Sequence, residues 1–391
     1  MSRSRPTKGP LEAAGPRSWR NWLAQLAGAR AATAVELPLY SDAWFTAEAL
    51  DLGPYRLLNA LPRTTHGSHF EWKPAIVLRA EHLLTPETGD MSVTDDAHYH
   101  GGSLYDEVAA LVALHLGVRL VAGPIEREFG YSDDPLGRPR GHSAAVLPTL
   151  PARADAPQIP WLFGNRSLAD LRLLRTYADV APDAAFALVK SARLHQQALW
   201  VADTSPETAW LLLVSALETA AGFWNAARLT PAQQLELSYS ALAKRLRAST
   251  DATVFDDVAA TLHGLIGSTG KFVAFCITFA PEPPEERPRL GRFDFEPGAY
   301  KAAIKRIYEY RSRALHGGTP FPHPMCMPPM SGHDGTGVAE ERMSALGAGS
   351  RGATWNAADV PMHLHLFAHI TRGVLMNWWR TLPAEGGADG S

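Results

Sequence analysis

The side chains best suited to chemistry lie in one stretch near the end of a predicted helix, at Arg311 and His316. Their spacing on a helix corresponds to about 7.5 Å of rise and roughly 140° of rotation, so the two do not stack on one face. A long guanidinium can still reach around the last turn toward an imidazole. Arginine suits a phosphate because it stays charged and presents a planar fork, and histidine suits proton transfer because its unperturbed pKa is about 6.5. The pair therefore favours phosphate chemistry.

The helix that must position this pair is predicted over residues 298–316. Apolar side chains recur there at three- and four-residue steps, and Ala302 and Ala303 favour helix. Gly317 and Gly318 then supply a stop, and three prolines follow. His316 should therefore lie at the helix C-terminus, where the negative end of the dipole favours its protonated form.

The string Tyr308-x-x-Arg311-Ser312-x-x-x-His316-Gly317 resembles the Arg-x4–6-His motif of HEPN domains. In its Arg-Ser-x-x-x-His-Gly form it is similar to the ApeA-like HEPN branch. The resemblance covers about residues 183–382, and only this string is specific. It implies a metal-independent endoribonuclease of the toxin or antiviral-defence kind, with no cofactor, in which an RNA 2′-hydroxyl attacks the adjacent phosphorus.

The resemblance also implies a role for each residue of the motif. His316 would be the general base or acid, Arg311 would neutralise charge on the phosphoryl oxygens, and Ser312 would orient the scissile group. HEPN domains often place a polar or acidic residue on an early helix near this pair, and Glu218 has a similar position in an apolar helix. A structural ion pair of Glu218 with Arg311 is the alternative. The basic neighbours Lys305, Arg306 and Arg313 are the candidate RNA-binding residues.

The expected partners are RNA, a second copy bound through the helical domain, and a regulatory protein. A rival hypothesis is a non-catalytic HEPN-like module that binds a protein or a nucleotide and uses the motif only structurally. A third hypothesis is a metal-dependent enzyme, which requires three histidine ligands at about 2.0–2.3 Å from one ion. The histidines available for it are His323, His333, His365 and His369.

Composition limits the class of protein further. The formal net charge of -3 over 391 residues gives no global basic field, so any nucleic-acid contact must be local. The two cysteines, Cys276 and Cys326, form no spaced metal cluster and favour a reducing, cytoplasmic compartment. The sequence has no uninterrupted apolar run of about 18 residues, so no membrane span is predicted. The basic N-terminus lacks the apolar core of a signal peptide.

The predicted fold class is α+β, a mixed α/β accessory domain followed by a mainly α HEPN-like bundle. The predicted division of the chain is a disordered basic leader 1–30, the accessory domain 31–160, the helical domain 165–383 with loop insertions 280–297 and 319–358, and a disordered tail 384–391.

Within the accessory domain, periodicity predicts strands over 74–84, 118–122 and 125–131 and a helix over 104–116. Two polar groups stand out there. The first, Asp95, Asp96, His98 and His100, is interpreted as a solvated loop rather than a metal cluster. The second, Arg119, Arg127, Arg138 and Arg140, is interpreted as ordinary surface because acidic residues are interleaved with it.

Helical periodicity dominates the second half of the chain. The predicted helices run over 167–178, 183–201, 204–225, 231–248, 255–279, 298–316 and 362–381. Residues 150–161, which are rich in proline, are predicted to link the two domains.

Overall fold

The computed structural model describes residues 15–31, 33–59, 74–84, 92, 94, 96, 99–130, 134–140, 155–226, 230–262, 268–330, 337–342 and 348–382. The chain forms two compact units. Unit 1 comprises Met1–Arg153, Pro160–Trp200 and Trp379–Ser391, and unit 2 comprises Ala154–Ile159 and Val201–Trp378. Unit 1 contains the main sheet and unit 2 is mainly helical, so the α+β prediction is confirmed.

The sheet of unit 1 is antiparallel and centres on β1 (Thr33–Tyr40), which pairs with β5 (Pro74–His82) along its length. Leu37 faces Leu78, which faces Leu57 on the next strand, and all three are buried. This register gives the sheet one apolar face. The remaining strands of the main sheet are β3 (Ala49–Leu52), β4 (Tyr55–Asn59), β6 (Val121–Ala122), β7 (Arg127–Phe129) and β8 (Arg138–Pro139).

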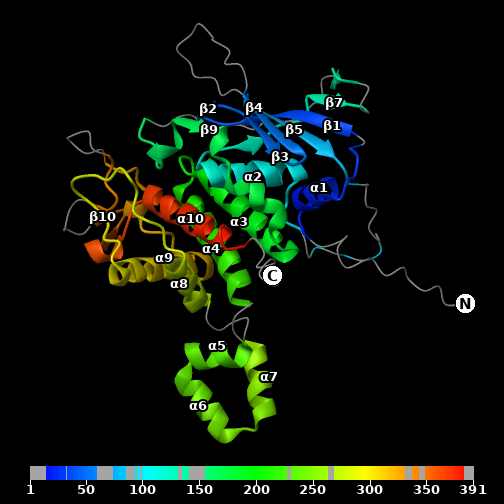
Figure 1. Cartoon of the computed structure of the whole chain (residues 1–391). Helices are drawn as coiled ribbons and strands as arrows, with labels where there is room; N and C mark the ends of the chain where they lie inside the picture. The colour runs from blue at the N-terminus through cyan, green and yellow to red at the C-terminus, as the bar shows by residue number, and fades with distance from the viewer. Residues whose placement is uncertain are drawn as a thin grey trace, which may run out of the picture. The chain divides into compact units, whose positions relative to one another are not determined.

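Helices α1 (Arg17–Leu26) and α2 (Leu104–Leu116) lie on one side of this sheet (Figure 1). α2 begins with a capping box, in which the Ser103 side chain accepts from the Asp106 N–H and the Asp106 carboxylate accepts from the Ser103 N–H. It ends at Gly117, whose φ of 66° is the left-handed conformation that glycine adopts without strain. The predicted helix over 104–116 is confirmed.

The prediction of a disordered leader over 1–30 is wrong where α1 lies, and residues 1–14 are outside the described residues. Trp19 and Trp22 are buried, and Trp22 packs edge-on against Tyr55 and Tyr177. The basic residues had suggested a solvated segment. The two tryptophans three positions apart were the stronger signal, because they share one helix face.

The rest of unit 1 joins this core through short elements. β2 (Trp44–Thr46) pairs in parallel with β9 (Asn165–Ser167), and η1 (Pro160–Leu162), η2 (Leu168–Asp170) and η3 (Leu173–Asp179) precede α3 (Pro182–Val201). The predicted α-helix over 167–178 is wrong, because Ser167 is held in the extended pairing and its side chain caps only a 3-10 turn. The predicted helix over 183–201 is confirmed, but it groups with the sheet.

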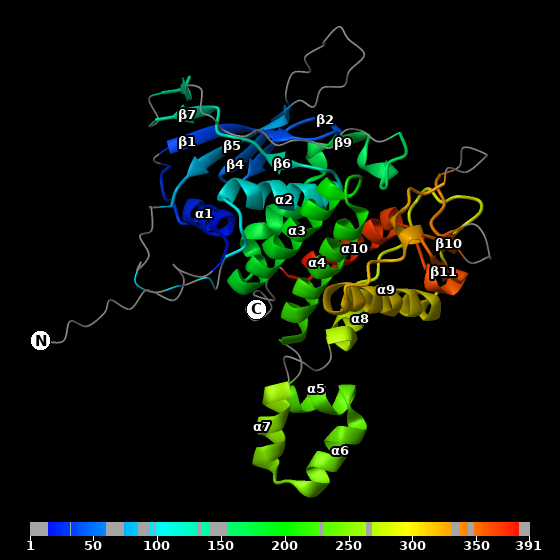
Figure 2. The same ribbon diagram turned by 180° about the vertical axis from the view of Figure 1, so that it is seen from behind.

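Unit 2 packs α4 (Pro206–Ala226), α8 (Ser268–Thr278), α9 (Pro297–Gly317) and α10 (Leu364–Trp379) around an aromatic core. Trp210 stacks on Phe367 at 4.8 Å between ring centroids, and Phe275 meets both Trp224 and Trp378 edge-on. Figure 2 shows these helices from behind. The other α-helices described in this unit are α5 (Pro231–Ser238), α6 (Ser240–Ser249) and α7 (Ala252–Leu262).

Two long predicted helices are each divided in the structure. The helix expected over 231–248 breaks at Tyr239, whose φ and ψ of -139° and 59° are not helical. The helix expected over 255–279 becomes α7 and α8, and residues 263–267 between them lie outside the described residues. Apolar periodicity continues across both breaks, which is why the pattern alone merged the helices.

The two predicted insertions are tied together by one buried carboxylate. Glu340 is 2% exposed and accepts hydrogen bonds from the Arg287 guanidinium at 2.8 and 2.5 Å and from the Phe293 N–H at 2.8 Å. The elements of the second insertion and its C-terminal flank are η4 (His323–Cys326), β10 (Ala348–Ser350), β11 (Ala353–Trp355) and η5 (Ala357–Asp359).

None of the helices in the described part of the chain has the length and apolar character needed to cross a bilayer.

Trp22→Ala should lower the free energy of unfolding by about 3–5 kcal/mol, because it empties a site enclosed by two tyrosine rings. The measurement is urea unfolding followed by circular dichroism. Trp44, which is 57% exposed, provides the matched control, and Trp44→Ala should change the value by no more than about 0.5 kcal/mol. Equal effects of the two substitutions would contradict the packing of α1.

Candidate functional site

The motif lies on α9, as the sequence predicted. Pro297 occupies the first turn, where its missing N–H costs nothing, and the helix ends at Gly317. Gly318 follows with φ 62°, and its N–H donates to the Arg313 carbonyl. This glycine-dependent stop fixes His316 in the last turn.

Arg311 points from α9 toward α4. Its Nη2 lies 2.5 Å from Oε2 of Glu218, and the Tyr308 hydroxyl donates to Oε1 of the same carboxylate at 2.9 Å. The Arg311 and Glu218 side chains are only 20% and 21% exposed. Since hydrogen bonds to an ionised group are stronger than neutral ones, Glu218 fixes both the guanidinium and the phenol.

The electrostatics of Glu218 combine two opposing effects. Burial raises the pKa of its carboxyl above the ordinary value, and the charge of Arg311 and the hydrogen bond from Tyr308 lower that pKa in part. The side chain is thus a partly desolvated carboxylate that depends on its two partners on α9. It can orient Arg311 toward a bound anion, and it can also serve as the structural ion pair that was the alternative.

His316 is exposed, and so is its neighbour Leu315, at 52%. The structure therefore brings together Arg311, Glu218 and Tyr308 and leaves the imidazole open to solvent five residues further along. Ser312, next to Arg311, is half-buried. Tyr308 was part of the motif string without a role, and its hydrogen bond to Glu218 gives it one.

The predicted RNA-binding cations are engaged with neighbours inside the chain. Arg306 lies 3.0 Å from Glu309 and 3.3 Å from Asp359, and Lys305 is 4.0 Å from Glu309. Arg313 lies over the ring of Tyr310, with 4.5 Å between its guanidinium carbon and the ring centroid. Half-exposed pairs of this kind contribute little free energy, so a phosphate can compete for these cations.

The described histidines of the metal hypothesis are not grouped as ligands of one ion. In the residues that the structure describes, no group of three His, Cys, Asp or Glu side chains could hold a metal ion, and His333 lies outside them. Burial lowers the pKa of His365 to about 3. His369 contacts the Glu282 carbonyl at 3.1 Å, and His323 contacts the Ser350 hydroxyl at 2.8 Å.

The four arginines of the accessory region do not form a basic face. Arg119 is fully buried, donates to Asp42 at 2.8 Å and to the Leu199 carbonyl at 2.6 Å, and so is not the surface residue that was predicted. The exposed arginines are paired with acidic residues: Arg127 with Glu36, Arg138 with Asp134 and Arg140 with Glu128.

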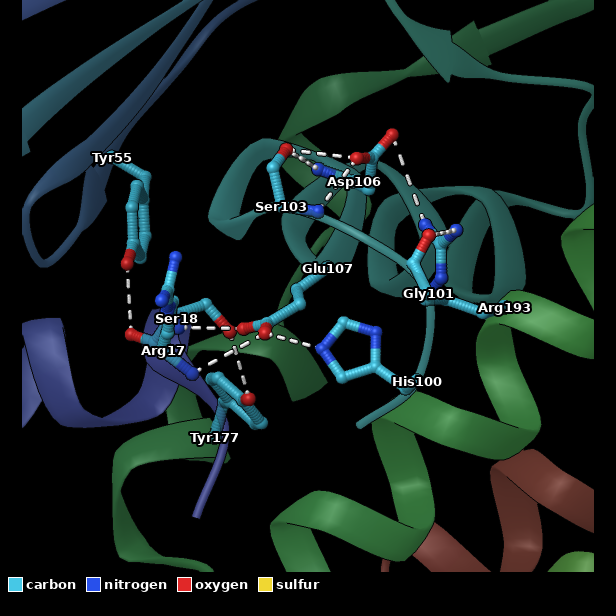
Figure 3. A network of polar contacts seen from close by, with 10 residues as sticks. All are labelled: Arg17, Ser18, Tyr55, His100, Gly101, Ser103, Asp106, Glu107, Tyr177 and Arg193. Carbon is cyan, nitrogen blue, oxygen red and sulfur yellow. Dashed lines mark hydrogen bonds and ion pairs between the residues drawn. The ribbon is translucent and has the colours of Figure 1, made fainter. Parts of the chain in front are cut away.

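A buried polar network in unit 1 was missed by the sequence analysis (Figure 3). Glu107 is 1% exposed, and its carboxylate accepts from the backbone N–H groups of Ser18 at 2.6 Å and Arg17 at 3.3 Å. His100 Nε2 lies 2.7 Å from the same carboxylate. The carboxylate thus supplies the N-terminal cap that α1 lacks locally, since Pro16 offers no side-chain hydrogen bond.

The network corrects the solvated-loop interpretation at His100, whose side chain is only 6% exposed. Asp96 is exposed as predicted, and Asp95 and His98 lie outside the described residues. The available signal was Glu107 itself, a charge directly before a run of apolar helix residues. A carboxylate in that position must find partners or remain solvated.

Glu107→Ala should destabilise the protein by about 2–5 kcal/mol, because it leaves two helix N–H groups and His100 without their acceptor. Glu107→Gln retains one acceptor oxygen and should cost less. Glu48, an exposed carboxylate of the same unit, is the control for loss of charge alone. Urea unfolding of the three variants checks the order, and a Glu107→Ala effect as small as that of Glu48→Ala would contradict the capping role.

Because the pKa of Glu218 is raised by folding, the folded state binds its proton more tightly than the unfolded state. The contribution of Glu218 to stability should therefore fall as the pH rises from the ordinary carboxyl value, near 4.3, through the folded value. Glu218→Gln cannot titrate, so subtracting its stability from that of the wild type isolates this fall. Urea unfolding between about pH 4 and 7 measures it. A difference that increases with pH would show that the ion pair outweighs burial.

Comparison with models of protein families, with curated proteins and with solved structures gives no match to this chain.

Proposed function

We propose that this protein is a metal-independent endoribonuclease of the HEPN type. The observation that carries the proposal is the arrangement on α9, where Arg311 is oriented by Glu218 and His316 is exposed one helical turn and a half further on. The motif string supplies the two residue types that RNA transesterification needs, a fixed cation and a titratable imidazole.

The reaction proposed is intramolecular transesterification. The RNA 2′-oxygen loses its proton to a base and bonds to phosphorus, the bond from phosphorus to the 5′-oxygen breaks, and that oxygen gains a proton. The products are a 2′,3′-cyclic phosphate and a 5′-hydroxyl. His316 moves one of these protons, Arg311 stabilises charge on the phosphoryl oxygens, and Ser312 orients the phosphate.

Binding of RNA involves the basic residues along α9. Lys305, Arg306 and Arg313 give up their weak internal contacts for the phosphates that flank the scissile bond. The protein acts in the cytoplasm as a dimer of the helical unit, in a defence or toxin system under the control of a partner protein. These statements follow from the resemblance of the motif to HEPN domains.

A non-catalytic module is the second candidate, and one observation favours it. The Arg311 guanidinium is already bound to Glu218, so the motif has a structural use without any substrate. The two candidates differ in what Arg311 must do. In the nuclease Arg311 contributes to cleavage beyond its effect on folding, whereas in a non-catalytic module the wild type does not cleave RNA and Arg311 affects only the stability of the fold.

Purified protein incubated with total RNA in EDTA should produce fragments with cyclic phosphate and 5′-hydroxyl ends. His316→Ala should lower the cleavage rate by about 10²–10⁴, the usual contribution of general acid–base catalysis. Arg311→Ala should lower it by about 10²–10³. Leu315→Ala changes an exposed residue in the same turn and should retain wild-type activity.

Thermal unfolding of the same variants separates loss of catalysis from loss of folding. Arg311→Ala combined with Glu218→Gln removes the guanidinium without leaving an unpaired carboxylate, so this double variant should fold and remain inactive. Absence of cleavage by the wild-type protein on RNA of any source would refute the nuclease. Cleavage that requires Mn²⁺ or Zn²⁺ and rises steadily with pH would instead indicate a metal-bound hydroxide.

A further inference from the structure

The helices α5, α6 and α7 pack on one another and form a small lobe between Pro231 and Leu262. A segment below about 40 residues seldom buries enough apolar surface to be stable alone. Its core consists of Leu235, Ala243, Phe255 and Ala259, with Ala232, Leu246 and Leu262 packed against them. Such a lobe gains stability from any surface that covers it.

The charges of the lobe are separated between two helices. α6 carries Lys244, Arg245 and Arg247 and no acidic residue, whereas α7 carries Asp256 and Asp257 and no basic residue. Arg247 is satisfied within the lobe by Glu236 at 2.5–2.8 Å and by the ring of Phe255. Among the described residues, Lys244, Arg245, Asp256 and Asp257 have no ion-pair partner, and all four are exposed.

Each helix also exposes one large apolar side chain beside its free charge. Leu242 is 41% exposed and precedes Arg245 by three positions on α6, and Val254 is 43% exposed and precedes Asp257 by three positions on α7. Residues three apart are neighbours on a helix surface. The lobe therefore presents an apolar and basic surface on α6 and an apolar and acidic surface on α7.

We propose that these two surfaces bind each other in a second copy of this chain. A two-fold axis places α6 of one copy against α7 of the other, so the same complementary contact forms twice. Leu242 meets Val254, and Arg245 meets Asp257, across each half of the interface. RNA is a poorer occupant, because a polyanion bound to α6 would lie near the exposed carboxylates of α7. This proposal rests on the dimer of the helical unit proposed above and names its contact surface, but it does not depend on RNA cleavage.

The test reverses the free charges of α6 or of α7 in the full-length chain. Light scattering then measures the molecular mass over roughly 1–100 μM, the range in which small interfaces associate. Wild type should form dimers. Lys244→Glu with Arg245→Glu makes both helices acidic, and Asp256→Lys with Asp257→Lys makes both basic, so each double variant alone should be monomeric. An equimolar mixture of the two double variants should form heterodimers, because each acidic helix then faces a basic one. Unfolded variants could not do this.

Lys190→Glu reverses an exposed cation of unit 1 and serves as the control, which should dimerise as the wild type does. Four outcomes would overturn the proposal. They are a monomeric wild type at every concentration, double variants that still dimerise alone, a mixture that stays monomeric, or a Lys190→Glu variant that loses the dimer as the double variants do.

Discussion

A carboxylate removed from water must be given hydrogen-bond donors, and this constraint organises much of the structure. Three glutamates meet it by joining segments that are far apart in sequence. Glu107 caps α1, Glu340 holds the two insertions of unit 2 together, and Glu218 joins α4 to α9. Each provides direction as well as attraction, because a carboxylate accepts from a limited set of positions. Apolar packing alone would leave the same segments in contact without fixing their orientation.

The two units use different means to form a core. Unit 1 buries aliphatic side chains between one face of an antiparallel sheet and α1 and α2, and the two tryptophans of α1 are buried with them. Unit 2 stacks aromatic rings between helices, and Trp210 contacts Phe321 and Phe367 within one column. Aromatic rings suit unit 2 because each ring buries a large area, and the helices that it fills the space between are far apart in the sequence.

The candidate site combines a rigid part and an open part. Arg311 and Tyr308 are fixed on the side of α9 that faces α4, so their positions are set by the packing of two long helices. His316 lies beyond that packing, in the last turn before a glycine stop. A fixed cation lowers the reorganisation needed when charge develops, whereas a titrating imidazole needs access to solvent or substrate. The arrangement is consistent with the proposed division of labour between the two residues.

The sequence by itself determined the α+β class, the presence of helices at α2, α3, α4, α9 and α10 with ends that differ by one to a few residues, and the pairing of Glu218 with Arg311 as one of two alternatives. These follow from local signals: apolar periodicity, capping residues, a glycine stop, and a single charge in an apolar helix face. Tertiary structure decided the rest. It placed Trp19 and Trp22 in the core and buried the side chains of His100 and Arg119. It also grouped α3 with the sheet, and it left Arg311 partly buried and His316 exposed. These outcomes depend on partners dozens of residues away, and the free energy of burying a polar or aromatic side chain is set by those partners, which local sequence patterns do not contain.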